Sequence, residues 1–137
     1  MTDRGLVAKK LARIATCLHE LRTMASLDRL RDDVREKRFV EHTLQIAIQC
    51  ALDVASHIAS DRRLGEPETN RALFQLLARA DVISVDLSQR LAEMAGFRNV
   101  LVHGYDDVQI PIVEDVVRNH LGDLDEFVAS VMRILEP

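Results

Sequence analysis

The segment RNVLVHGY, residues 98–105, places an arginine, an asparagine, a histidine and the only tyrosine of the chain within eight positions. In a helix, Asn99 and His103 are four residues apart and share a face. The long Arg98 side chain starts about 100° around the helix axis and can reach across to the same point. We therefore expect Arg98, Asn99 and His103 to converge on one small ligand.

These residue types suit the cleavage of RNA without a metal ion. Arginine supplies a permanent planar cation for phosphate oxygens, and histidine, with a reference pKa of roughly 6.5, exchanges a proton near neutrality. A base removes the proton of a ribose 2′-hydroxyl, that oxygen attacks the neighbouring phosphorus, and the cation stabilises the phosphoryl oxygens. DNA lacks the hydroxyl, so the scheme selects RNA. The same spacing also fits a histidine that caps a helix or lies on the surface, and spacing alone leaves catalysis open.

Two further polar residues, Asp53 and His57, lie four positions apart in an otherwise apolar segment. They could form a carboxylate–imidazole pair that lines the cleft, or they could be structural groups with satisfied hydrogen bonds, which we favour because buried polar groups are usually paired. The five histidines form no Glu-x-x-His pattern, and the chain has neither a Cys-x-x-Cys pair nor a glycine-rich phosphate loop. We therefore expect no metal site and no cofactor.

The first half of the chain predicts two helices and a loop. Apolar residues recur at alternating spacings of four and three from Val7 to Ala25, which is typical of a helix packed on other helices. Asp28 can cap a second helix, and beyond Phe39 this helix is apolar on more than one face, so we expect that half at the centre of the bundle. Residues 61–70, with a glycine and a proline, form the clearest loop.

The second half predicts two or three more helices. A short helix covers about residues 68–80, and Ser84 or Asp86 can cap the next one, which ends in the RNVLVHGY segment. After Pro111 the apolar stripe keeps its helical phase through Gly122. We therefore predict one long C-terminal helix with a weak point at that glycine, and an antiparallel all-α bundle of about five helices.

Composition and charge agree with one such domain spanning residues 1–137. The 22 acidic and 18 basic residues leave a net charge of −4, which argues against a protein that coats nucleic acid non-specifically. Cys17 and Cys50 fall in apolar segments, where free buried thiols are expected. The absence of a stretch of about 18 apolar residues indicates a cytoplasmic protein without a membrane span.

The motif from Arg98 to Tyr105 resembles the Arg-polar-x-x-x-His motif of HEPN domains, in the form with a tyrosine two residues after the histidine that HepT-like toxins carry. The flanking sequence at 38–58, 65–84 and 91–108 is also similar, and the resemblance covers roughly residues 5–135. It implies an all-helical homodimer whose cleft lies between two motif-bearing helices, acting as a metal-independent ribonuclease toxin on tRNA or mRNA. A two-fold axis would bring two copies of Arg98 and His103 together.

The resemblance also implies a partner. HepT-like toxins of type VII-like pairs are neutralised by a minimal nucleotidyltransferase antitoxin that transfers AMP to the motif tyrosine, here Tyr105. The added phosphate would pair with Arg98 in the place of the substrate. Two alternatives stay open: a non-catalytic helical dimer that binds the nucleotidyltransferase or a nucleotide, which the acidic net charge slightly favours, and the antitoxin member of such a pair.

Overall fold

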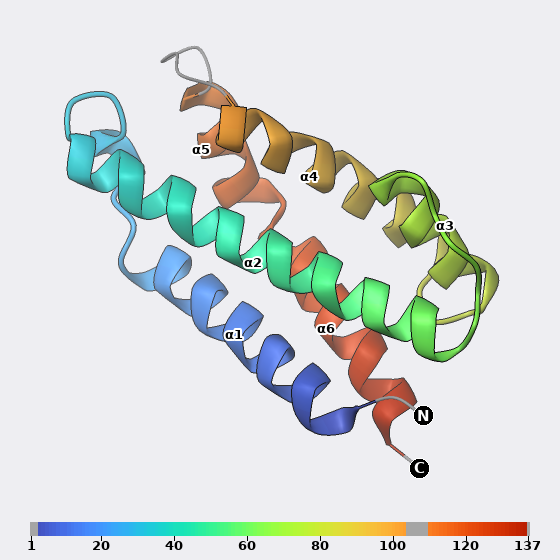
Figure 1. Cartoon of the computed structure of the whole chain (residues 1–137). Helices are drawn as coiled ribbons and strands as arrows, with labels where there is room; N and C mark the ends of the chain where they lie inside the picture. Colours follow the sequence, from blue (N-terminus) through green and yellow to red (C-terminus); the bar gives the residue numbers. More distant parts are fainter. Residues whose placement is uncertain (1–2, 104–109, 137) are drawn as a thin grey trace.

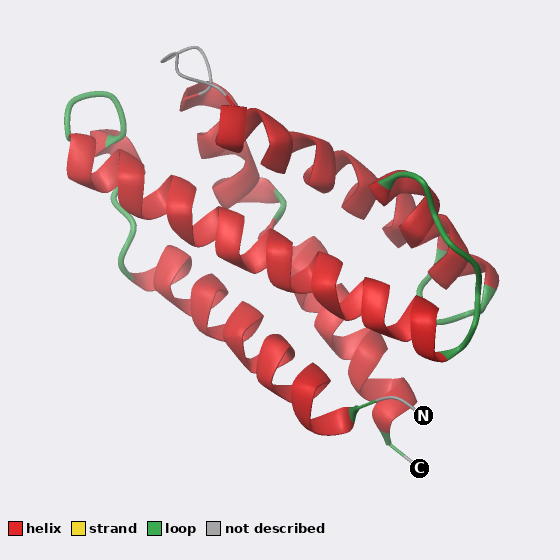
Figure 2. Ribbon diagram, viewed as in Figure 1, coloured by secondary structure: helices red, strands yellow, loops and turns green. Residues whose placement is uncertain are grey.

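The computed structural model describes residues 3–103 and 110–136, and all regular structure in these ranges is helical (Figure 2). This confirms the all-α prediction. The described residues form six α-helices and one short 3₁₀ helix, one α-helix more than the sequence predicted. The elements are α1 (Arg4–Thr23), η1 (Leu27–Arg29), α2 (Val34–Asp61), α3 (Asn70–Arg79), α4 (Val85–His103), α5 (Ile110–Asn119) and α6 (Leu121–Leu135).

Four long helices build the bundle. In Figure 1, α2 runs antiparallel to α1 on one side and to α4 on the other, and α6 packs across the three of them. The short helix α3 packs on α4 at one end of the bundle. Toward the other end, residues of α4 and α5 line one pocket, so these two helices lie side by side there (Figure 1). The antiparallel arrangement is therefore confirmed, and α2 is its central helix.

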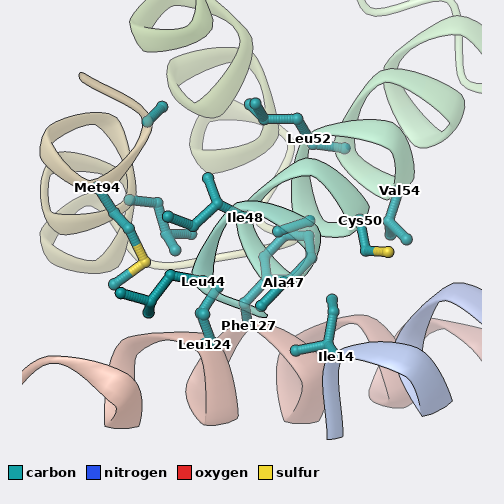
Figure 3. Packing of buried hydrophobic residues seen from close by; sticks show 14 of the residues in the cluster. Ile14, Leu44, Ala47, Ile48, Cys50, Leu52, Val54, Met94, Leu124 and Phe127 are labelled. Carbon is teal, nitrogen blue, oxygen red and sulfur yellow. The ribbon is translucent and has the colours of Figure 1, made fainter. Parts of the chain in front are cut away.

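Burial along α2 explains its central position. Leu44, Ala47 and Ile48 are at most 2% exposed and meet Met94 of α4 and Phe127 of α6 (Figure 3). Because apolar residues cover more than one face of this half of α2, burying them requires neighbours on several sides. The prediction that this half of the helix lies at the centre is confirmed.

The start of α2 differs from the prediction. The helix is capped by Asp33, whose carboxylate accepts hydrogen bonds from the backbone amides of Arg35 (2.9 Å) and Glu36 (3.4 Å). The predicted cap, Asp28, lies in η1 instead. Leu30 is 2% exposed, so the chain between the two helices is anchored in the core before α2 begins. Asp33 caps α2 in place of Asp28 because its side chain satisfies two of the free amides in the first turn.

Other helix boundaries fall close to the predicted ones. The helix α3 begins two residues later than predicted, because the Thr69 hydroxyl caps it by accepting from the amide of Ala72 (3.0 Å). Of the two possible caps for α4, the structure selects Ser84, whose hydroxyl accepts from the amide of Leu87 (3.0 Å). Residues 62–69 form the predicted loop.

The predicted long C-terminal helix is wrong. The structure ends α5 at Asn119 and begins α6 at Leu121, so the break lies at His120, two residues before the expected weak point at Gly122. The Asp115 carboxylate accepts from the side-chain amide of Asn119 (2.7 Å) and contacts the His120 imidazole at 3.0 Å. These side-chain contacts lie in the last turn of α5 and at the break, and the spacing of apolar residues gives no sign of the break.

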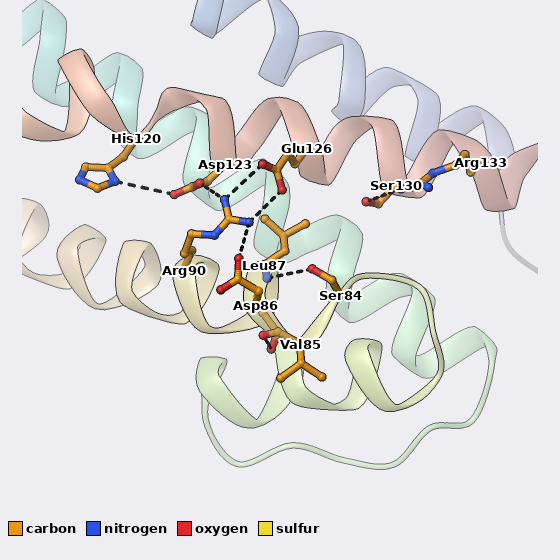
Figure 4. A network of polar contacts seen from close by, with 11 residues as sticks. Ser84, Val85, Asp86, Leu87, Arg90, His120, Asp123, Glu126, Ser130 and Arg133 are labelled. Carbon is orange, nitrogen blue, oxygen red and sulfur yellow. Dashed lines mark hydrogen bonds and ion pairs between the residues drawn. The ribbon is translucent and has the colours of Figure 1, made fainter.

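A charged cluster fastens α4 to α6 (Figure 4). Arg90 of α4 donates to the buried carboxylate of Asp123 and to Glu126 (2.9 Å) on α6, and it pairs with Asp86 one turn earlier on α4 (3.1 Å). These bonds, to Glu126 and Asp123, raise the pKa of the Arg90 guanidinium, so it stays charged. The cluster fixes the first half of the helix that carries the RNVLVHGY segment.

Cys17 and Cys50 are free and buried, as predicted. Burial is the main cause that raises the pKa of both thiols. Among the described helices, none is both long and apolar enough to cross a membrane.

Candidate functional site

The C-terminal turns of α4 carry the motif residues. Arg98 and Asn99 lie in the last two turns and His103 is the final residue of the helix, as the sequence predicted. Arg98 is half-buried and Asn99 is exposed. Tyr105 lies outside the described residues. Convergence of the three side chains on one ligand remains a prediction.

Core packing holds this end of α4 in place. Phe97 and Leu101 are only 9% and 6% exposed, so they anchor the helix on either side of Arg98. Val100 and Val102, in the same turns, are 41% and 39% exposed. Arg98 therefore lies at the boundary between the core and the solvent, where its charged end can meet a ligand while its stem packs against the protein.

A surface groove of about 310 Å³ opens beside Arg98. Its walls come from three helices: α1, α2 and the end of α4. The side chains that line it are mostly polar or cationic, and they include Lys10, Arg13, His42, Gln45, Gln49, Asp53 and Arg98. The structure thus brings together Asp53 and Arg98, two residues that the sequence singled out separately.

Asp53 is held from two sides in this groove. Its carboxylate accepts from the Lys10 ammonium across the helix pair (2.9 Å) and from the Gln49 amide one turn earlier (2.8 Å). Burial opposes its ionisation, but these hydrogen bonds and the nearby charges of Lys10 and Arg98 outweigh it, and the pKa of Asp53 falls below its usual value. The hydrogen bond that Lys10 donates to Asp53 in turn raises the pKa of Lys10. Asp53 is therefore an anion already neutralised by a partner within the chain.

The possible Asp53–His57 pair is not formed among the described residues. The His57 Nε2 atom accepts a hydrogen bond from the backbone amide of Asp3 (3.1 Å), at the start of α1. Both side chains do have hydrogen-bond partners, as the structural interpretation required, but each partner comes from outside the pair. Of these two residues, Asp53 lines the groove beside Arg98 and His57 does not.

Sequence reasoning missed Lys10, Arg13 and His42 as neighbours of Arg98. Lys10 and Arg13 are three residues apart on α1, beside its apolar stripe, and such a pair ordinarily indicates only a solvated helix face. Nothing in the spacing along α1 or α2 indicates that these residues meet the end of α4. The parts of the chain that the structure describes contain no group of three His, Cys, Asp or Glu side chains arranged to hold a metal ion.

Comparison with known proteins identifies the family. Residues 11–131, most of the chain, match the Ribonuclease HepT-like family. The chain belongs to the HepT-like ribonuclease family. The resemblance that the motif and its flanks indicated is thereby confirmed.

Two HepT-like relatives are similar in sequence. The mRNA nuclease HepT of Shewanella oneidensis is 32% identical over 124 residues, which cover 90% of this chain and 93% of that protein. The tRNA nuclease HepT of Aphanizomenon flos-aquae is 34% identical over 83 residues, or 61% of this chain and 56% of that one. The two relatives are thus named for different RNA substrates.

Solved structures of a toxin–antitoxin pair and of a HEPN toxin agree with the fold. A toxin–antitoxin structure with AMP-PNP superimposes with a TM-score of 0.88 at 29% identity, covering 95% of this chain and 99% of that one. The tri-AMPylated HEPN toxin of Shewanella oneidensis, in complex with its MNT antitoxin, gives a TM-score of 0.86 at 30% identity, covering 97% and 99%. The HEPN bundle described here is therefore the same fold.

Proposed function

We propose that this HepT-like chain is the toxin of a toxin–antitoxin pair and a metal-independent endoribonuclease, with Arg98 and His103 as its catalytic residues and Asn99 beside them. The observation that carries the proposal is Arg98 itself. It lies on the helix that ends at His103, lines an open groove, and has a buried Nε atom with no hydrogen-bond partner among the described residues. A guanidinium that lines such a groove can pair with phosphate oxygens through its terminal nitrogens.

The reaction follows from these groups. One histidine takes the proton of the ribose 2′-hydroxyl, and the 2′-oxygen attacks the adjacent phosphorus. The bond to the 5′-oxygen of the next nucleotide breaks, which leaves a 2′,3′-cyclic phosphate, and the departing oxygen takes a proton from a second histidine. Arg98 stabilises the charge that develops on the phosphoryl oxygens. RNA is the substrate because the attacking oxygen is the 2′-hydroxyl, and cellular RNA places the activity in the cytoplasm.

A homodimer supplies the second histidine in this proposal. Val102 is 39% exposed and lies four residues after Arg98, on the same side of α4, so a second copy packed on this face would cover its apolar surface. A two-fold axis there would place the partner's motif next to this one. Light scattering during gel filtration should give twice the mass of the chain, and a single-chain mass would contradict the dimer.

Regulation by AMP transfer is the second part of the proposal. The Tyr105 hydroxyl attacks the α-phosphorus of ATP bound to a minimal nucleotidyltransferase, pyrophosphate leaves, and the phenolic proton is released. The new phosphodiester is an anion two residues from His103, where it can pair with Arg98 and block RNA. The AMPylated state of the similar Shewanella toxin supports this.

The nuclease activity is tested by digesting total tRNA and mRNA in the presence of a chelator. We expect cleavage by the wild type, and a loss of at least about a hundredfold in His103→Ala and in Arg98→Ala. Arg71→Ala, an exposed residue of α3, is the matched control and should cut like the wild type. Cleavage by His103→Ala at the wild-type rate would refute this mechanism.

Control by the antitoxin is tested by intact-mass measurement of the protein produced with and without its nucleotidyltransferase. Mass increases in adenylyl steps on the peptide that contains Tyr105, together with lost cleavage, are expected. Tyr105→Phe should keep its activity and stay unmodified. Modification elsewhere in the chain would contradict the role of Tyr105.

One observation favours a second function. The net charge of −4 is unusual for a protein that engages RNA, and it suits a non-catalytic dimer that binds a nucleotidyltransferase or a nucleotide through the same motif. In that case Arg98→Ala would weaken partner binding, and no RNA product would form with any variant.

A further inference from the structure

The groove beside Arg98 carries a charge opposite to that of the whole chain. Among the described residues that line it, Lys10, Arg13 and Arg98 contribute three cations and Asp53 contributes one carboxylate, so these residues together carry two positive charges. The chain as a whole carries −4. Local positive potential in a concave site raises the concentration of anions there even when the protein is acidic overall.

The two arginines of the groove provide this excess charge. Asp53 is occupied by Lys10 at 2.9 Å and by Gln49 at 2.8 Å, so neither arginine depends on it for an ion pair. Within residues 3–103 and 110–136, Arg13 and Arg98 form no ion pair, and both line the groove. Both guanidinium groups are therefore available to an anionic ligand.

The polar lining continues along α2. His42, Gln45 and Gln49 follow one another at spacings of three and four, so they form a row along one face of the helix. His42 and Gln45 also line a neighbouring hollow of about 500 Å³, to which Arg38 belongs. From Arg38 to Gln49 this row extends for about 16 Å, which suits an elongated ligand with repeated hydrogen-bond acceptors.

We propose that Arg13 and His42 bind backbone phosphates of the RNA strand next to the phosphodiester that Arg98 contacts, and that the strand continues along α2 toward Arg38. This inference rests on the proposed function, because it assigns the path of that substrate. Arg13 and His42 are exposed and lie on helices other than the motif helix. They are binding residues that hold the strand, and they do not take part in the chemistry.

The test separates binding from cleavage by using a single-stranded RNA with 2′-O-methyl riboses, which cannot be cut by the proposed mechanism. Affinity is measured against salt concentration for the wild type, Arg13→Gln, His42→Ala and the control Arg71→Gln. The logarithm of the binding constant falls as the logarithm of the salt concentration rises. Losing one phosphate contact should make this slope less steep by about 0.7. We expect Arg13→Gln to weaken binding about tenfold at low salt, His42→Ala to weaken it as well, and the control to match the wild type.

Cleavage of unmodified RNA then completes the test. Arg13→Gln should raise KM and leave kcat within about twofold, as expected for a group that binds ground state and transition state equally. An unchanged affinity and salt slope in Arg13→Gln would overturn the inference. A change in the oligomeric mass of Arg13→Gln would also overturn the inference, because it would show that the groove is a contact between two copies of the chain. If Arg13 governs RNA binding but no protein cuts RNA, the groove assignment stands and the proposed function fails.

Discussion

The three carboxylates around Arg90 differ in burial, and their energetic coupling to this arginine should differ in the same order. The side chain of Asp123 is 11% exposed, that of Glu126 is 55% exposed, and that of Asp86 is 80% exposed, while Arg90 itself is 32% exposed. All three make close contacts (Figure 4). From the distances alone, the three carboxylates would be expected to have similar coupling energies with Arg90. Solvent screening should make these energies differ.

The expected coupling energies follow from these exposed fractions. The exposed pair with Asp86, four residues apart on one helix, should contribute about 0.4 kcal/mol. Glu126 receives two hydrogen bonds (2.9 and 3.3 Å) but is largely solvated, so about 0.8 kcal/mol is expected. Asp123 is buried and hydrogen-bonded to a cation, which gives about 2 kcal/mol after allowance for the partial exposure of Arg90.

Double-mutant cycles measure these couplings. Arg90→Met is combined in turn with Asp123→Asn, Glu126→Gln and Asp86→Asn, and the free energy of unfolding is obtained from urea titrations at one protein concentration. Arg90→Met alone should cost about 2 to 3 kcal/mol, which corresponds to a fall in Tm of about 4 °C per kcal/mol for a chain of this size.

An internal control is available on α5. Arg118 and Glu114 form an exposed pair four residues apart at 3.0 Å, so their coupling should equal that of Arg90 and Asp86. Equal couplings for all three partners of Arg90, or the largest coupling for Asp86, would refute the argument that burial controls the strength of these contacts.

Three further outcomes are expected. Phe127→Ala empties a fully buried site and should cost about 3 to 5 kcal/mol in the urea titration, whereas Met132→Ala, at 49% exposure, should cost less than about 0.5 kcal/mol; similar costs would contradict the core assignment. Ser84→Ala should cost about 1 kcal/mol through the lost cap of α4, and Ser84→Gly clearly less; no cost in Ser84→Ala would count against the cap. The lowered pKa of Asp53 means that its ionised form stabilises the fold fully above about pH 5 and that this stabilisation is lost as pH falls below the usual value of 3.8. The difference in unfolding free energy between wild type and Asp53→Asn should therefore be constant near neutrality and shrink as pH falls below 3.8, and a difference that is the same at neutral and acidic pH would oppose the pairing with Lys10.

Features that depend on residues close together in the chain were predictable. The apolar spacing from Val7 onward, the buried half of α2 and the helix that ends with His103 were all read correctly, because side chains three and four apart meet on one helix face in any fold. The burial of Cys17 and Cys50 followed from the same stripes. Membership of the HepT-like family followed from the motif and its flanking sequence.

Contacts between polar side chains of different helices could not be predicted. Asp53 and His57 share a helix face, but Asp53 pairs with Lys10, 43 residues away, and His57 with the amide of Asp3, 54 residues away. The break between α5 and α6 at His120 was also missed, because the apolar phase continues across it. The periodicity of apolar residues indicates which face of a helix is buried. It does not indicate which polar groups of the neighbouring helix lie opposite that helix.

The sequence by itself determined the helices, the central place of α2 and the positions of Arg98, Asn99 and His103 on one helix, because helical periodicity and a local motif are properties of neighbouring residues. Only the tertiary structure decided that Lys10, Arg13, His42 and Asp53 surround Arg98. The rotation of each helix about its axis is set by the burial of its apolar stripe, and the polar residues at the edges of the stripes of α1, α2 and α4 are thereby brought into one groove.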